Sequence, residues 1–196
     1  MELIYPAYEV PLLPRPNVSH PSEPIPPGTE MLPAVDENGN VIGRMTRDYA
    51  HGGDCPMHPV VHLHILRRDE KLYLQKRSMK KKLLPGYWDT AVGGHVSFGE
   101  GVLEALYREA SEELGFTEFN PIPVTTYVFW GNHECELVNV FACVGNNFSP
   151  KPDHDEVSEG RWWSAEEIEE NLGKSILTPN FEQEYVRIRK ALASLL

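Results

Sequence analysis

Three glutamates within one helical turn are the residues of this sequence best suited to chemistry. Glu109, Glu112 and Glu113 stand at i, i+3 and i+4 in a segment whose apolar periodicity predicts a helix over residues 101–114. Carboxylates this close repel one another unless a cation lies among them, and their oxygens suit Mg²⁺ or Mn²⁺. The backbone carbonyl of Gly94, in the Gly-Gly pair upstream, could add a neutral ligand. The simpler interpretation is an acidic helix face exposed to solvent.

The residues around these glutamates resemble the Nudix box. Gly94 is followed after five residues by Glu100, and after seven more by the run 108–116, Arg-Glu-Ala-Ser-Glu-Glu-Leu-Gly-Phe. Ala110 is smaller than the aliphatic residue usual at its position, but every other defined position matches, so a chance acidic face is a poor explanation. The resemblance implies an α/β fold, a Nudix-type α/β/α sandwich with a mixed β-sheet, and a metal-dependent hydrolase of diphosphates.

The same resemblance implies roles for the residues of the box. Glu109 and Glu113 would be ligands of Mg²⁺ or Mn²⁺, and Glu112 a ligand or the base that takes a proton from the attacking water. Which glutamate is the base varies within the family, so all three stay candidates. We expect Glu100 and Arg108 to pair and brace the loop against the helix, with direct contact to the substrate as the alternative.

A second set of candidate metal ligands lies outside the box. His51 and His58 are seven residues apart, His95 follows the Gly-Gly pair, and Glu134 and Glu136 occupy alternate positions. This pattern resembles the metal site of type 1 isopentenyl-diphosphate isomerases, a branch of the Nudix superfamily. Any one histidine alone is more often a surface or hydrogen-bonded side chain, and that interpretation stays open.

The isomerase resemblance includes residues that hold a diphosphate. The runs 75–78 (Gln-Lys-Arg-Ser) and 85–88 (Pro-Gly-Tyr-Trp), with Lys81 between them, are similar to motifs in which an Arg and a Lys bind the substrate. We therefore expect substrate contacts from Arg77 and Lys81, because a forked guanidinium and a point charge suit a diphosphate. Trp88 is the tryptophan best placed to stack on a substrate, although large aromatic residues more often belong to the core.

Two departures from the isomerases favour hydrolysis. The resemblance covers roughly residues 33–145, but the isomerases carry a Cys directly before the Gly-His dipeptide, to act at an allylic carbon, and this chain has Gly93 there. Cys135, between the two glutamates, is a remote substitute. The isomerases also keep mainly the last glutamate of the Nudix box, whereas this chain has the full set.

Three functions are compatible with these residues. The first is a Nudix hydrolase of a nucleoside or prenyl diphosphate, in which water attacks phosphorus. The second is an isopentenyl-diphosphate delta-isomerase in which Glu136 with Tyr127, or another residue, replaces the usual Cys. The third is a non-catalytic Nudix module that senses a diphosphate, which does not require three carboxylates on one turn. The missing carbon acid and the complete box favour the first.

The composition is that of an ordinary globular protein of 196 residues, 41% hydrophobic and 24% charged. A net charge of −11 argues against general nucleic-acid affinity, because binding to phosphates requires a basic surface. Three cysteines without a C-x-x-C pair predict reduced thiols and a cytoplasmic protein. Apolar runs are too short to span a membrane, and we expect no secretory leader.

The sequence divides into a proline-rich N-terminal arm, residues 1–30, and a Nudix domain, residues 31–196. Eight prolines in the arm exclude a regular helix or a central strand. The arm is therefore expected to be extended. It could lie along the body, reach the partner of a homodimer, or be a flexible leader.

Turn and periodicity signals place the elements of the domain. We expect a hairpin around Asn38-Gly39, a loop over residues 48–58, and a strand over residues 60–66 that carries His62 and His64 on one face. The other expected elements are strands over 71–76, 122–130, 136–144 and 161–163, a helix opened by a capping box at Ser164, and a closing helix over 179–196.

Overall fold

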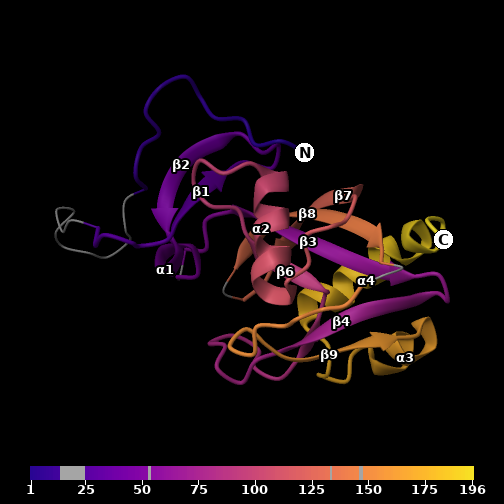
Figure 1. Cartoon of the computed structure of the whole chain (residues 1–196). Coiled ribbons are helices and arrows are strands. Elements are labelled where there is room, and N and C mark those ends of the chain that lie inside the picture. The colour runs from indigo at the N-terminus through magenta and orange to yellow at the C-terminus, as the bar shows by residue number, and fades with distance from the viewer. Residues whose placement is uncertain (14–24, 53, 133, 146–147) are drawn as a thin grey trace. The chain divides into compact units, whose positions relative to one another are not determined.

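The computed structural model describes residues 1–13, 25–52, 54–132, 134–145 and 148–196, in which helices and strands are interspersed (Figure 1). The elements are β1 (Met31–Val35), β2 (Val41–Thr46), α1 (Arg47–Ala50), β3 (His58–Arg67), β4 (Lys71–Arg77), β5 (Trp88–Asp89), β6 (Val92–His95), α2 (Val102–Leu114), β7 (Ile122–Trp130), β8 (Cys135–Val144), β9 (Val157–Trp163), α3 (Ala165–Asn171) and α4 (Pro179–Ala193). The expected α/β fold class is confirmed.

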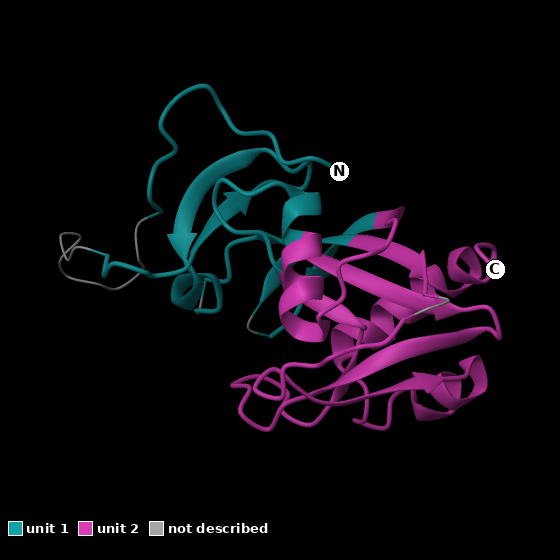
Figure 2. Cartoon of the chain, in the orientation of Figure 1, with its two compact units in different colours: residues 1–60, 95–105, 126–139 teal, residues 61–94, 106–125, 140–196 magenta. Residues whose placement is uncertain are grey.

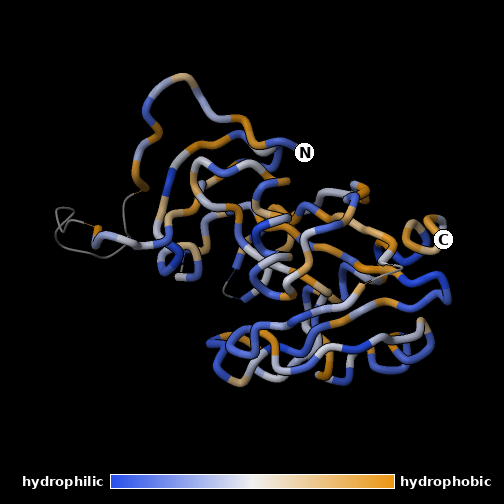
Figure 3. Tube along the Cα trace, viewed as in Figure 1, coloured by the Kyte–Doolittle hydropathy of each residue, from blue (hydrophilic) through white to orange (hydrophobic). Residues whose placement is uncertain are grey.

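The strands form two sheets. Strands β1 and β2 pair with each other, and the other seven form a sheet in the order β5-β4-β3-β8-β7, in which β6 pairs with β3 and β9 pairs with β4. The chain also divides into two compact units (Figure 2): unit 1 comprises residues 1–60, 95–105 and 126–139, and unit 2 comprises residues 61–94, 106–125 and 140–196. Figure 3 shows that hydrophobic residues are spread through both units.

The hairpin of unit 1 forms where the sequence predicts it. Gly39 has a φ of +80°, which glycine adopts without strain, and the Asp36 carboxylate accepts hydrogen bonds from the backbone N–H groups of Asn38 and Asn40. A small core beneath the hairpin comprises Leu32, Ala34, Met45 and Ala50. Local turn chemistry therefore accounts for this element.

The described part of the N-terminal arm lies along β2. The backbone of Ile4 exchanges hydrogen bonds with Gly39 and Val41, and Leu13 N–H donates to the carbonyl of Arg44. The prolines at positions 14, 16, 21 and 24 lie outside the described residues. The division of the chain into an arm and a domain stays a prediction.

The expectation of a loop over residues 48–58 is wrong at both ends. Residues 47–50 form the short helix α1, because the Thr46 hydroxyl caps it by accepting the Tyr49 N–H and because Ala50 is buried. His58 already belongs to β3. The polar composition of this segment predicted a loop, because the helix depends on two single residues, the capping Thr46 and the buried Ala50.

Unit 2 follows the predicted pattern with longer or additional strands. Helix α2 begins at Val102 and the capping box of α3 is present, with Ser164 and Glu167 each accepting the other's backbone N–H. Strand β9 begins at Val157 rather than at residue 161, and the short strands β5 and β6 were not expected. In the part of the chain described here, no helix has the length and apolar character needed to cross a bilayer.

Helix α4 buries the face that its periodicity predicts, together with one acid. Phe181, Tyr185, Ile188 and Leu192 are buried, as expected for an amphipathic helix packed on a core. Glu184 is also fully buried. A buried carboxylate is costly unless it is paired and hydrogen-bonded, so this residue requires partners.

Candidate functional site

Glu113 is held inside unit 2 by two hydrogen-bond donors. It lies in the last turn of α2 and is 5% exposed, and its Oε2 accepts from Gln75 Nε2 at 2.9 Å and from the Gly93 backbone N at 3.1 Å. Burial, and then the negative charge of Glu109, raise the pKa of Glu113 to about 7 from an ordinary 4.5. Glu113 is therefore near its protonation midpoint at neutral pH.

The carboxyl group of Glu109 lies directly against Gly94. A Cβ built on Gly94 would be 2.0 Å from Glu109 Cδ and 2.2 Å from its Oε1, so this approach requires a residue without a side chain. The sequence suggested Gly94 as a carbonyl ligand, and the structure adds that its missing Cβ gives Glu109 its place.

Arg108 lies between two of the three glutamates. Its Nη1 donates to Glu109 Oε1 at 2.7 Å and to Glu112 Oε2 at 3.1 Å. The Glu112 side chain is 60% exposed, whereas that of Glu109 is 15% exposed. The structure therefore brings Glu109 and Glu113 to the β6 strand and leaves Glu112 closer to solvent.

The other residues predicted for the Nudix site have identifiable contacts. Glu100 Oε2 accepts the N–H of Ser97 at 2.9 Å, and its pairing with Arg108 stays a prediction. Arg77 contacts Asp89, with 3.3 Å between Nη1 and Oδ2, and donates to the carbonyl of Leu83.

Lys81 is ion-paired with Glu156, and its positive charge acts to lower the pKa of Glu113. Trp88 is 8% exposed and packs edge-on against Trp163. The indole of Trp88 thus contributes to packing, and its role in substrate binding stays a prediction.

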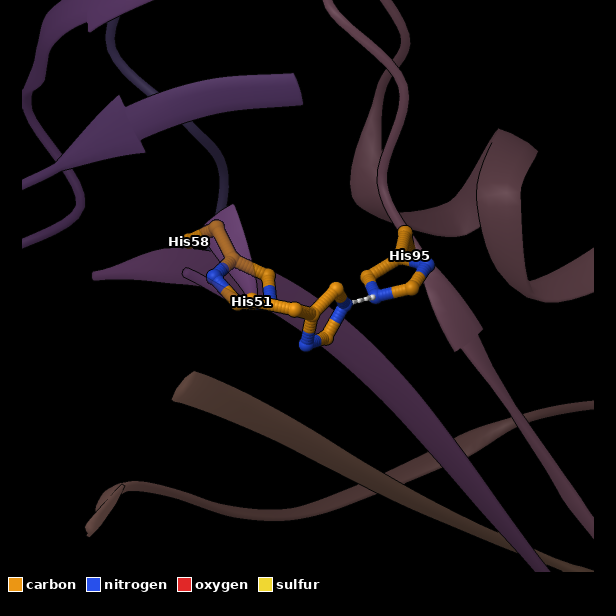
Figure 4. A group of neighbouring side chains, drawn as sticks. All are labelled: His51, His58 and His95. Carbon is orange, nitrogen blue, oxygen red and sulfur yellow. Dashed lines mark hydrogen bonds between the residues drawn. The ribbon is translucent and has the colours of Figure 1, made fainter. Parts of the chain in front are cut away.

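Three histidines of unit 1 form a compact group of potential metal ligands (Figure 4). His51 follows α1, His58 begins β3 and His95 ends β6, and one ligand atom from each lies within 4.8 Å of the others. The Nε2 atoms of His51 and His95 are 3.0 Å apart, so one ring is the donor and the other the acceptor. These predicted ligands are therefore neighbours in the fold.

His58 has the features of a neutral ligand. Its Nδ1 is 3.2 Å from the carbonyl of Pro56, which leaves a lone pair on Nε2, and that buried nitrogen has no hydrogen-bond partner among the described residues. Burial is the main cause that lowers the pKa of His58 to about 4. The imidazole is therefore unprotonated at neutral pH, as ligation of a metal requires.

Glu134 and Glu136, the two glutamates predicted to complete this site, stay predicted ligands. Glu136 is buried and Glu134 partly exposed, and neither belongs to the group of ligand atoms within 4.8 Å. Glu30 is an unpredicted neighbour of this group, with its Oε1 3.6 Å from His95 Nδ1. No motif marked Glu30, because it belongs to the proline-rich arm and meets His95 only through folding.

The thiol of Cys135, the residue before Glu136, has a raised pKa. Burial, and then the charges of Cys55 and Glu136, raise the pKa of Cys135 to about 11. The three cysteines, Cys55, Cys135 and Cys143, are free. Cys135 is thus a protonated thiol at neutral pH.

The chain belongs to the Nudix family, because the NUDIX domain family model matches residues 56–181. Among curated relatives, isopentenyl-diphosphate Delta-isomerase 1 of Photorhabdus laumondii is 30% identical over 168 residues, which cover 81% of this chain and 94% of that protein. The Nudix hydrolase YfcD of Escherichia coli K12 is 32% identical over 142 residues, which cover 71% of this chain and 77% of that protein. The expected family and its isomerase-like branch are confirmed.

Solved Nudix structures share the fold. DR0079 from Deinococcus radiodurans has a TM-score of 0.69 at 22% identity, over 81% of this chain and 99% of that one. The MutT protein of Methanosarcina mazei has a TM-score of 0.59 at 25% identity, over 69% of this chain and 95% of that one. The NUDIX domain of Shewanella oneidensis NrtR, solved with ADP ribose, has a TM-score of 0.57 at 14% identity, over 68% of this chain and 87% of that one.

Proposed function

We propose that this protein is a metal-dependent hydrolase of a small-molecule diphosphate, of the nucleoside or prenyl type, in which water attacks phosphorus. The observation that carries the proposal is the arrangement of Glu113 and Glu109 at the Gly93–Gly94 pair. The Glu113 carboxyl group is buried and accepts hydrogen bonds from Gln75 and Gly93, and the Glu109 carboxyl group occupies the space that a side chain on Gly94 would fill. Oxygen donors of this kind fit Mg²⁺ or Mn²⁺, and a cation would relieve the repulsion that helps to raise the pKa of Glu113.

The residues of the chain have separate tasks in this proposal. A bound divalent cation supplies charge neutralisation at the diphosphate. Glu113, with a pKa of about 7, can release its proton to become a ligand or accept a proton from water near neutral pH. Arg108 holds Glu109 and Glu112 in place through its two hydrogen bonds. Which of the three glutamates is the base stays open.

Arg77 and Lys81 are the proposed contacts to the diphosphate. Both are paired with a carboxylate in this structure, Arg77 with Asp89 and Lys81 with Glu156. A diphosphate carries more negative charge than either carboxylate and offers more acceptor oxygens, so it can replace them as a partner. The influence of the Lys81 charge on Glu113 supports a place close to the acidic site.

The second candidate function is isomerisation of isopentenyl diphosphate, which the histidine group and the isomerase relative favour. Three imidazole nitrogens, one of them buried and without a hydrogen-bond partner among the described residues, fit a borderline transition-metal ion better than Mg²⁺. The residue directly before the Gly-His dipeptide is Gly93, which has no acid or base, and Cys135 has a raised pKa. These features support hydrolysis over isomerisation.

Incubation with Mg²⁺ or Mn²⁺ and a panel of nucleoside and prenyl diphosphates, including isopentenyl diphosphate, tests the proposal. We expect phosphate release, and its loss in Glu113→Gln but not in Glu104→Gln, an exposed glutamate on the same helix. A shift of the double bond without phosphate release would identify an isomerase. Binding without either reaction would identify a diphosphate sensor.

The setting of the activity is proposed on similar grounds. The three free thiols support a cytoplasmic protein, since oxidising compartments favour disulfides. The net charge of −11 supports a small-molecule substrate over a nucleic acid.

A further inference from the structure

A buried acid of α4 binds two histidines of β3 within unit 2. Glu184 Oε2 lies 2.9 Å from His62 Nδ1, and Glu184 Oε1 lies 2.6 Å from His64 Nε2. Glu184 and His64 have no exposed surface, and His62 is 8% exposed. The sequence placed His62 and His64 on one face of their strand, but it did not indicate this partner 122 residues away.

The hydrogen bonds fix which nitrogen of each ring carries a proton. An ionised carboxylate only accepts, so His62 donates through Nδ1 and His64 through Nε2. Burial alone would raise the pKa of Glu184, but the two histidines outweigh burial and lower it, so this carboxyl is ionised. Both oxygens of Glu184 therefore act as fixed acceptors, and the orientation of each imidazole is set.

The ring of His62 lies beside β6, the strand whose Gly93 N–H binds Glu113 of α2. A Cβ built on Gly93 would lie 3.4 Å from His62 Cδ2 and 3.6 Å from its Nε2, so the imidazole lies beside the position that a side chain on Gly93 would occupy. The N–H of Gly93 donates to Glu113 Oε2 at 3.1 Å. A series of neighbouring groups thus runs from Glu184 through His62 and Gly93 to Glu113.

His64 binds the other oxygen of the same carboxylate, Glu184 Oε1. Its ring packs near Phe181 of α4, with 6.2 Å between ring centroids, and its Nδ1 is buried without a partner among the described residues. The two histidines therefore share the task of anchoring α4, and His62 is the one whose ring lies nearest to the Cβ position of Gly93.

We propose that Glu184 and His62 are positioning residues for the acidic site: Glu184 orients His62, and His62 holds the Gly93 amide at the place where it binds Glu113. This inference rests on the proposed function only in taking Glu113 as a metal ligand. Partners that orient a metal ligand typically change metal affinity or activity by roughly 10- to 100-fold when they are lost.

Three variants of the full-length protein test the proposal: Glu184→Gln, His62→Gln and His64→Gln. The first readout is the rate of solvent exchange of the Gly93 amide in ¹H–¹⁵N spectra of the metal-free protein, which reports its hydrogen bond to Glu113 and does not depend on the ring current of His62. The second is the affinity for Mn²⁺, followed by electron paramagnetic resonance. Thermal unfolding controls for loss of the anchor.

We expect Glu184→Gln and His62→Gln to speed solvent exchange of the Gly93 amide and to weaken Mn²⁺ binding at the acidic site about tenfold or more. We expect His64→Gln to lower the melting temperature without either change. If Glu184→Gln fails to fold, the two histidine variants still separate positioning from anchoring. Unchanged exchange of the Gly93 amide in folded His62→Gln, or equal effects of both histidine variants, would overturn the proposal.

These readouts separate the inference from the proposed function. Faster exchange of the Gly93 amide and weaker Mn²⁺ binding support positioning even if the wild-type protein hydrolyses no diphosphate. Hydrolysis by the wild-type protein with no response of Gly93 to His62→Gln would leave the function standing and refute the positioning role.

Discussion

Gly94→Ala tests how the acidic site holds its ligands. Gly93 and Gly94 are not among the glycines with positive φ, so alanine meets no conformational obstacle at either position. A Cβ on Gly94 would lie 2.0 Å from Glu109 Cδ, whereas carbon atoms in contact stay about 3.5–4 Å apart. The Glu109 carboxyl group must therefore move by roughly 1.5 Å or more.

This displacement should impair metal binding far more than it lowers the free energy of unfolding. The obstructing atoms are at the end of a flexible side chain, so we expect the free energy of unfolding to change by no more than about 1 kcal/mol. Mg²⁺ binds its ligands at about 2.0–2.1 Å with little tolerance, so a carboxylate moved this far no longer coordinates. We expect the Mg²⁺ concentration for half-maximal phosphate release to rise at least about tenfold.

Gly93→Ala is the matched control. The three heavy atoms nearest to a Cβ there belong to His62 and Thr90 and lie at 3.4–3.6 Å, which is ordinary contact. The assay compares the Mg²⁺ dependence of phosphate release, the Mn²⁺ affinity and the urea unfolding of the two variants. A metal dependence of Gly94→Ala equal to that of the wild type would refute the role of Gly94 in placing Glu109, and Gly93→Ala shows the effect of a methyl group that does not displace Glu109. A loss of several kcal/mol of stability in Gly94→Ala with unchanged metal affinity would do the same.

Three further predictions concern individual side chains. The pKa of Glu113, about 7 in the folded protein, lies above the ordinary 4.5, so its contribution to stability is present below pH 4.5 and is lost as the pH rises to 7. In metal-free buffer, urea unfolding should therefore show that the free energy of unfolding of Glu113→Gln rises by about 3 kcal/mol relative to the wild type between pH 5 and pH 8. Turnover should be abolished in the same variant. A turnover within a few-fold of the wild type would remove the metal assignment. The pKa of His58, about 4, lies below the ordinary 6.5, so stability should fall by about 3 kcal/mol as the pH drops from 6.5 to 4, and melting curves of His58→Gln should lack this slope. Glu109→Gln should weaken Mn²⁺ binding more than Glu112→Gln, because the Glu109 side chain lies beside Gly94 and is 15% exposed, whereas that of Glu112 is 60% exposed. A calorimetric titration that gives the reverse order of affinities would contradict this placement.

Elements set by neighbouring residues could be predicted from the sequence. The Asn38-Gly39 hairpin, the capping box at Ser164 and helix α2 each depend on residues within a few positions of one another. Helix α1 was missed because a single cap and one buried alanine decide it, and β6 because two glycines carry no side-chain pattern. Composition describes such short segments poorly.

In the candidate site, too, some features could be predicted from the spacing of residues and others could not. Spacing alone brought Glu109, Glu112 and Glu113 onto one turn, because a helix repeats every 3.6 residues. Spacing could not show that Glu113 is buried with Gln75 or that Glu112 stays exposed. Burial depends on which strands lie beside the helix, and burial is what sets the pKa of a carboxyl group.

The sequence by itself determined the family, the acidic turn and the glycine pair beside it, since these are patterns of contiguous residues. The tertiary structure decided that His51, His58 and His95 meet, that the Glu109 carboxyl occupies the space above Gly94, and that Glu184 reaches His62 across 122 residues. Contacts between distant segments follow from packing and from the need to pair each buried charge, and no local pattern records them.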